Sequence, residues 1–167
     1  MTLLEEDRKR MPSGKLPKFQ VYMRKYQESK FKPIKLIYRI LFKFTRDKRL
    51  NEISINTQIG GGLYMGHANL ITINPHTIIG KNVNIHKGVT IGQENRGKRK
   101  GTPIIGDSVW IGINSTIVGK IVIGDDVLIA PNSYVNCDVP SHSIVIGNPC
   151  KIIPRANATE DYINHKI

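Results

Sequence analysis

Apolar residues return at every sixth position from Ile53 to Val135, and this period constrains the fold more than any other feature of the sequence. Ile, Met or Val leads each unit, and Gly or another small residue usually follows. A period of six fits neither an amphipathic helix, which repeats at about 3.6 residues, nor a simple alternating strand. It is typical of short strands and tight turns that wind a parallel β-helix, in which three units complete a coil and each lead residue points inward.

The repeat is interrupted twice. Two extra residues lie between Met65 and Ile73, and the stretch from Ile91 to Ile105 is two residues longer than a pair of units. Insertions into a regular coil must bulge from it, and loops on a rigid scaffold commonly carry functional sites. We therefore expect a site beside these breaks.

Counting the units in threes predicts which lead residues stack on one another. One face then collects Met65, Ile85, Ile105 and Ile123, and the next collects Ile53, Ile73, Ile91, Ile111 and Ile129. This register predicts that His67 and His86 share one edge of the prism. It also predicts a column without bulky side chains formed by Gly92, Gly112 and Ala130.

The formal charge of +12 is concentrated in the N-terminal segment. Residues 1–50 hold 15 Lys and Arg against 5 Asp and Glu, whereas the remaining residues hold 10 against 8. Because the β-helix region is close to neutral, we expect no nucleic-acid partner. Residues 1–18 mix charges with proline and are expected to form a mobile arm.

Residues 34–48 predict a basic amphipathic helix. Its apolar side comprises Ile34, Ile37, Leu41 and Phe44, and its basic side comprises Lys35, Arg39, Lys43 and Arg46. In the usual arrangement the apolar side packs against the protein's own core. The alternative is a peripheral membrane contact, in which the helix rests on an anionic lipid surface.

The overall composition is that of an ordinary globular protein. No apolar run approaches the roughly 18 residues of a membrane span, and MTLLEEDRKR lacks the apolar stretch of a signal peptide. Cys137 and Cys150 are too few for a disulfide framework or a structural zinc site. We expect a cytoplasmic protein, associated with the inner face of the membrane if residues 34–48 contact lipid.

From Glu52 to Ile153 the sequence resembles the serine acetyltransferase branch of the hexapeptide-repeat transferases. The branch pattern D-I-H-P-x-A-x-I-G-x-G-x-x-x-D-H-x-T-G corresponds to EISINTQIGGGLYMGHANL, and HKGVTIG, IGDSVWIG and VIGNPCKII match later motifs. The resemblance implies an all-β fold, with a left-handed parallel β-helix of hexapeptide repeats at residues 51–153. A short basic, partly helical segment at residues 1–50 precedes it, and a tail at residues 154–167 follows. A homotrimer and acetyl-CoA as co-substrate are also implied.

The matched positions imply catalytic roles. His67 takes the place of the family's catalytic His, and a neutral imidazole can accept the proton of an attacking hydroxyl. Glu52 takes the place of the Asp that orients this His, at the same separation of 15 residues. His86 either supports catalysis or is structural. We expect no metal, because a carbonic-anhydrase-like zinc site needs three histidines and His67 and His86 are too few.

The resemblance also suggests binding residues. Coenzyme A is expected along the later coils, over Gly92, Gly112 and Ala130, with Lys151 reaching a phosphate. The loop at the second break carries cations that could bind an acidic sugar, a nucleotide or CoA phosphates, or remain solvated. These candidate substrate residues are Arg96, Lys98, Arg99 and, at the end of the loop, Thr102.

The positions at which this sequence departs from the family pattern bear on the identity of the acceptor. The acidic residue that precedes the family's catalytic His is Gly66 here, and the family's Arg-His pair is Gly101-Thr102. A zwitterionic amino acid needs charged partners. We therefore expect an O-acetyltransferase acting on another hydroxyl, that of a sugar of a surface or capsular polysaccharide. The alternatives are a serine O-acetyltransferase of cysteine biosynthesis and a non-catalytic trimeric β-helix scaffold.

Overall fold

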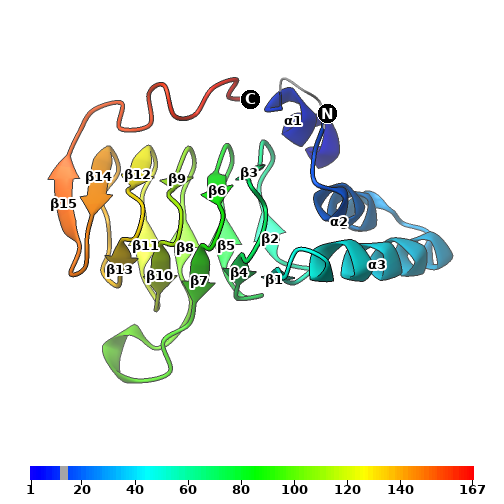
Figure 1. Cartoon of the computed structure of the whole chain (residues 1–167), viewed down its shortest axis with the longest axis horizontal. Helices are drawn as coiled ribbons and strands as arrows, with labels where there is room; N and C mark the ends of the chain where they lie inside the picture. Colours follow the sequence, from blue (N-terminus) through cyan, green and yellow to red (C-terminus); the bar gives the residue numbers. More distant parts are fainter. Residues whose placement is uncertain (12–14) are drawn as a thin grey trace.

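The computed structural model describes residues 1–11 and 15–167. Short parallel strands stack into a β-helix with three flat sides, and three helices lie at the end where the chain begins (Figure 1). The helices are α1 (Leu3–Lys9), α2 (Lys18–Glu28) and α3 (Lys32–Asp47), and a 3-10 turn, η1 (Gly97–Arg99), lies in a long loop.

Each side of the β-helix is one sheet. Sheet I contains β1 (Glu52–Ile53), β4 (Thr72–Ile73), β7 (Thr90–Gly92), β10 (Thr116–Val118) and β13 (Tyr134–Val135). Sheet II contains β2 (Gln58–Ile59), β5 (Ile78–Ile79), β8 (Ile104–Ile105) and β11 (Val122–Ile123). Sheet III contains β3 (Tyr64–Gly66), β6 (Asn84–His86), β9 (Trp110–Ile111), β12 (Val127–Ile129), β14 (Ser143–Ile146) and the antiparallel β15 (Lys151–Pro154).

The lead residues of the hexapeptide units fill the interior, as the sequence predicts. Every lead residue from Ile53 to Val135 is buried, and most of the neighbouring residues in the strands are exposed or partly exposed. Several turns between strands require a left-handed backbone, which asparagine tolerates better than most residues; Asn82, Asn114 and Asn132 all have φ between 56° and 59°. The period of six therefore reflects one inward residue and one tight turn per unit.

The predicted register is correct before the long loop and wrong after it. The loop leaves sheet I at Gly92 and re-enters the β-helix on sheet II at Ile104. The stretch from Ile91 to Ile105 is therefore one long unit and not a pair of units. Consequently Ile105 and Ile123 stack on Ile79 in sheet II, away from Ile85.

The N-terminal arm is ordered where the structure describes it, so the expectation of a mobile arm is wrong for residues 1–11. Thr2 and Glu5 form a capping box that starts α1. The carboxylate of Asp7 is fully buried and accepts hydrogen bonds from Arg24 of α2 and from the backbone N–H of Leu63. Arg24 in turn donates to the carbonyl oxygens at the first coil, which joins the helices to the β-helix.

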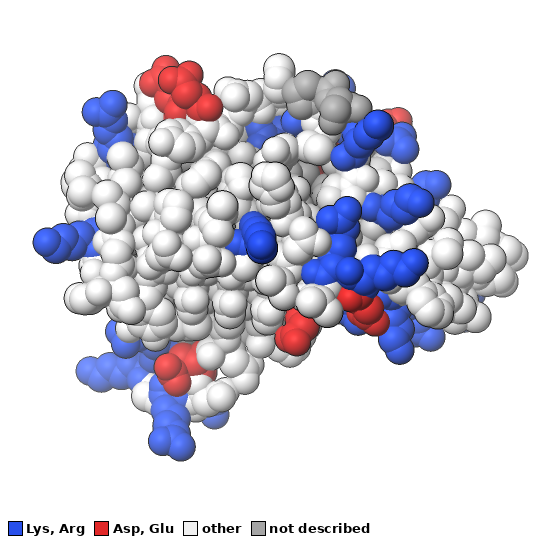
Figure 2. Space-filling view, viewed as in Figure 1, with Lys and Arg blue, Asp and Glu red and all other residues white. Residues whose placement is uncertain are grey.

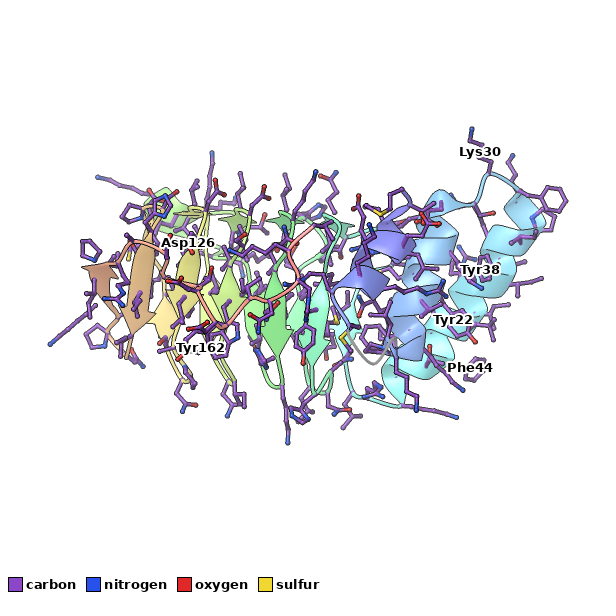
Figure 3. The ribbon with its side chains drawn as sticks, turned by 90° about the horizontal axis from the view of Figure 1, so that it is seen from above. Tyr22, Lys30, Tyr38, Phe44, Asp126 and Tyr162 are labelled. Atoms are coloured by element: carbon purple, nitrogen blue, oxygen red, sulfur yellow. The ribbon has the colours of Figure 1, made fainter. Side chains whose placement is uncertain are left out.

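The structure confirms the helix predicted at residues 34–48, which is α3, but the predicted apolar face does not pack on the core. Phe42 is the buried side chain of α3, whereas Ile37 and Phe44 are 54% and 66% exposed. In Figure 3, Phe44 projects from the outer side of the helix, away from Tyr22 and Tyr38. Among the described residues, no helix is long and apolar enough to cross a membrane.

The C-terminal tail returns along the β-helix toward α1 (Figure 1). Asp126 anchors it by accepting hydrogen bonds from the N–H of Ala158 and from the N–H and hydroxyl of Thr159. Burial raises the pKa of Asp126, but the hydrogen bonds from Thr159, His142 and Ala158 outweigh it, so the pKa falls from 3.8 to about 2. At the far end, Ile167 and Asn82 exchange two hydrogen bonds.

Candidate active site

His67 lies at the corner where the chain passes from sheet III to sheet I. The two extra residues of the first break lengthen this corner, and His67 and Leu70 both adopt the left-handed conformation, with φ of 52° and 57°. The ring of His67 is exposed and lines a cleft of about 730 Å³. The bulge expected at the first break therefore presents its histidine to solvent in a hollow.

His86 lies beside this corner, as predicted. Gly66, the neighbour of His67, is in register with His86 in the next coil. The His86 ring packs between Tyr64 and Trp110, at centroid distances of 6.2 and 4.7 Å. Burial lowers the pKa of His86 below 6.5, and the nearby His67 lowers it further. His86 is therefore held neutral at physiological pH.

The ring of His86 occupies the space that a side chain at position 66 would need. A Cβ atom placed on Gly66 would lie 2.6 Å from Nδ1 of His86, well inside van der Waals contact. The Nε2 atom of His86 is buried and has no hydrogen-bond partner among the residues that the structure describes. The carboxylate that stands here in the family pattern is thus replaced by a neutral imidazole from the coil above.

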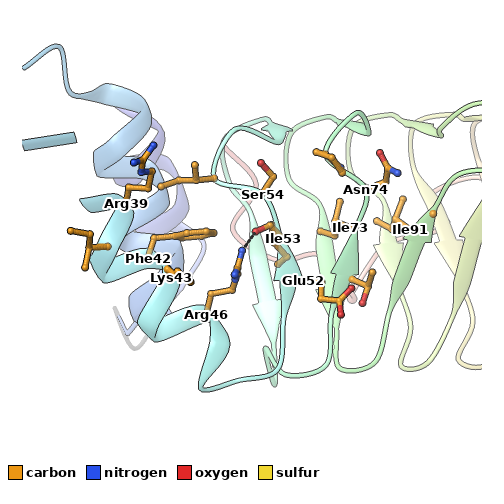
Figure 4. Close-up of a pocket in the computed structure, with 15 residues that line it drawn as sticks. Arg39, Phe42, Lys43, Arg46, Glu52, Ile53, Ser54, Ile73, Asn74 and Ile91 are labelled. Carbon is orange, nitrogen blue, oxygen red and sulfur yellow. Dashed lines mark hydrogen bonds between the residues drawn. The ribbon is translucent and has the colours of Figure 1, made fainter. Parts of the chain in front are cut away.

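Glu52 is exposed at the start of sheet I, in register with Thr72. It lines a groove of about 850 Å³ between α3 and sheet I (Figure 4), into which α3 contributes Arg39, Lys43 and Arg46. Within the described part of the chain, Glu52 makes no hydrogen bond to His67. Because contacts between a base and its orienting group often close only around substrate, the orienting role of Glu52 stays a prediction.

The predicted column of small residues is wrong for Gly92 and holds for the other two. Gly92 is on sheet I, in register with Val118. Gly112 and Ala130 follow Ile111 and Ile129 on sheet III, whose pairing places them one above the other. Ile85 and Ile111 are also paired, so the same column continues through His86 to Gly66 and ends beside His67. The corrected register thus connects the predicted coenzyme position to the candidate base.

The long loop is not brought to His67 within one chain. It leaves from the corner between sheets I and II, and Figure 1 shows it projecting from the β-helix. Its cations Arg96, Lys98 and Arg99 are exposed, and the hydroxyl of Thr102 donates to the carbonyl oxygen of His76. Lys151 is exposed at the start of β15. The binding roles of these residues stay predictions.

Part of the basic surroundings of His67 is not predicted from the sequence. Lys48 and Arg49 line its cleft, together with Lys15 and Lys18. Figure 2 shows Lys and Arg gathered over the helical end on the face in view. The run KRL at residues 48–50, shortly before the first repeat, could have predicted these cations. Residues just ahead of the first coil must lie next to one of its corners. In residues 1–11 and 15–167, no three His, Cys, Asp or Glu side chains form a group that could hold a metal ion.

Comparisons with known proteins agree with this fold. The family described as bacterial transferase hexapeptide (six repeats) matches residues 102–137. A serine acetyltransferase of Helicobacter pylori is 36% identical over 104 residues, which cover 62% of this chain and 61% of that protein. A serine acetyltransferase of Staphylococcus xylosus is 36% identical over 128 residues, covering 77% of this chain and 57% of that protein. The chain thus spans about three fifths of the length of these relatives.

Solved structures confirm the fold class. Serine acetyltransferase from Brucella abortus superimposes with a TM-score of 0.76 at 25% identity, covering 94% of this chain and 70% of that one. The Neisseria gonorrhoeae serine acetyltransferase in complex with serine gives 0.70 at 29% identity, covering 90% and 67%. A β-helix of the opposite hand would not superimpose, so the predicted left-handed β-helix is confirmed. In repeat, fold and sequence the chain is thus similar to the serine acetyltransferase branch of the hexapeptide-repeat transferases.

Proposed function

We propose that this chain is an acetyl-CoA-dependent O-acetyltransferase in which His67 is the general base. The observation that carries the proposal is the column Gly66, His86, Gly112 and Ala130 on sheet III, which leads from the later coils to His67. Gly112 and Ala130 leave the later part of this column without bulky side chains, and an extended pantetheine arm fits such a surface, where backbone groups are accessible. The thioester would then lie at the end of the column, within reach of the imidazole.

The transfer follows from this placement. His67 accepts the proton of the acceptor hydroxyl while its oxygen attacks the thioester carbonyl carbon, forming a tetrahedral oxyanion. The oxyanion collapses, the C–S bond breaks, and the leaving thiolate of coenzyme A takes up the proton held by His67. Glu52 would stabilise the imidazolium formed in the first step. No acyl group becomes attached to the enzyme in this scheme.

L-serine is the acceptor that the relatives favour. The curated relatives are named serine acetyltransferases, and one similar structure is described as a complex with serine. Although charged groups are missing at positions 66, 101 and 102, the groove beside Glu52 offers other charges. The carboxylate of serine could pair with Arg39 or Lys43, which have no ion-pair partner among the described residues. Glu52 is the acidic side chain that lines the groove.

A sugar hydroxyl of a surface polysaccharide is the second candidate, and one observation favours it. The place next to His67 that would hold a carboxylate is filled by the neutral ring of His86. A neutral imidazole offers an ammonium group no opposite charge, whereas it can form a hydrogen bond with a neutral hydroxyl equally well. The His86 ring therefore disfavours an amino acid at this edge of the site.

We propose a homotrimer as the assembled form. Sheet II turns an apolar stripe to solvent, in which Ile78, Ile104 and Val122 are 44% to 51% exposed. A contiguous apolar surface of this kind marks a contact between proteins. Sedimentation should show a species near three times 18.8 kDa. A monomer that stays fully active on dilution would remove both the trimer and any site shared between subunits.

The assay that tests the function is thiol release from acetyl-CoA in the presence of L-serine, hexoses, amino sugars or acidic oligosaccharides. The proposal predicts acceptor-dependent release with at least one of them. A kcat/KM for L-serine above that of every saccharide supports the first candidate, and the reverse order supports the second. No release with any acceptor, from folded protein that binds acetyl-CoA, would favour the non-catalytic scaffold.

A further inference from the structure

The outer face of α3 carries large apolar side chains that no other part of the described chain covers. Around the helix, the side opposite α2 collects Leu36, Ile37, Ile40 and Phe44, and Phe31 precedes it. Each of these five residues is between 48% and 66% exposed. Large apolar side chains gathered on one exposed helix face mark an interaction surface, whereas single ones do not.

Packing fixes which side of α3 faces outward. Phe42 packs into the core beside Phe19, and Tyr38 stacks on Tyr22 of α2 with ring centroids 6.4 Å apart. The side chain of Arg46 donates to the carbonyl oxygen of Ile53 in the first coil. The helix therefore cannot turn its apolar face inward without losing these contacts.

Cations border the apolar face along one side. Lys32, Arg39 and Lys43 are exposed and lie next to Leu36 and Ile40 around the helix. The only acidic residue of α3 is Asp47, which is already paired with Arg46 at 2.7 Å. The surface thus offers apolar side chains bordered by uncompensated positive charge.

We propose that α3 docks on an anionic lipid surface, lying in the plane of the interface with its apolar face among the acyl chains. A helix with a broad apolar face and a Lys- and Arg-rich border is the pattern that binds membrane interfaces. Anionic headgroups complement the border, and each nearby cation adds to the attraction. A second copy of α3 complements it poorly, because residues 1–50 carry 15 cations against 5 anions and two such segments repel each other.

The test is co-sedimentation of the full chain with vesicles of phosphatidylcholine alone or of phosphatidylcholine and phosphatidylglycerol in equal parts. We expect binding to the anionic vesicles, weakened at least about tenfold on the neutral vesicles and by raised salt. The double substitution Ile37→Glu and Phe44→Glu should weaken binding to anionic vesicles at least about tenfold.

The matched control is Ile146→Glu with Ile153→Glu, which changes the charge equally at two residues 46% and 47% exposed at the far end of the β-helix. It should bind like the unmodified chain, and circular dichroism should show that both variants keep their fold. Equal binding to both vesicle types, absence of binding, or equal loss in the two variants would overturn the proposal. So would an α3 variant that shrinks the assembly in lipid-free solution, because a second copy of the chain would then be the partner.

Discussion

The β-helix and α3 use the same apolar residues and treat them in opposite ways. Ile85 and Ile111 in the β-helix are fully buried, whereas Ile37 and Ile40 of α3 are about half exposed. In the β-helix, each coil covers the next and turns each lead residue inward. In α3, the spacing of apolar residues predicts an apolar face and a basic face. It does not predict which of the two faces packs against the rest of the chain. The sequence of a repeat therefore predicts which of its residues are buried, because the coils bury one another. The sequence of a single helix does not, because burial depends on what the helix packs against.

The joint between the two regions should show the largest effect on stability. Replacing Asp7 with alanine leaves the guanidinium of Arg24 buried without its partner, and we expect the free energy of unfolding to fall by about 3–5 kcal/mol. Urea denaturation followed by circular dichroism measures this change. Asp47→Ala removes an exposed ion pair and is the control, with an expected loss below about 1 kcal/mol. Equal losses would show that the helices are not joined to the β-helix through Asp7.

Two isoleucines, one from each region, test directly whether burial differs between the β-helix and α3. Ile111→Ala opens a cavity inside a coil and should lower the free energy of unfolding by about 2–5 kcal/mol. Ile40→Ala removes a side chain that is 48% exposed and should change it by less than about 0.5 kcal/mol in the absence of lipid. Denaturation of the two variants under the same conditions provides the values. A large loss from Ile40→Ala would mean that another copy of the chain covers α3 in solution.

The tail should give the smallest stability effect, and it depends on pH. The pKa of Asp126 is lowered in the folded chain, so its contribution is present above pH about 3.8 and is lost as the pH falls through about 2. After allowance for solvent screening, Asp126→Asn should cost on the order of 1 kcal/mol at neutral pH. It should also reduce the pH dependence of the free energy of unfolding between these two pH values, and it should speed proteolysis of residues 155–167. If the stability of the Asp126→Asn variant fell with pH as steeply as that of the unmodified chain, the anchoring role of Asp126 would be contradicted.

The sequence predicted the β-helix and its inward residues because the period of six is a direct consequence of the coil. It also predicted that His67 and His86 lie together, since only one coil, lengthened by two residues, separates them. The predicted position of Gly92 in the column was wrong because the residues of the long loop were counted as units of six. A loop that leaves the β-helix at a corner has no such period. The burial of Asp7 and the His86 ring against Gly66 depend on contacts between distant residues, which no local pattern encodes.

The turnover of His67→Ala, compared with that of His76→Ala, tests most directly whether His67 is the general base. His67 lies in the cleft at the end of the sheet III column, whereas His76 is an exposed histidine at a different corner. With the best acceptor from the panel, we predict that His67→Ala lowers kcat by about 10²–10⁴ while acetyl-CoA still binds, and that His76→Ala keeps its activity. A His67→Ala variant with undiminished kcat, or one matched by His76→Ala, would contradict the assignment of His67 as the base.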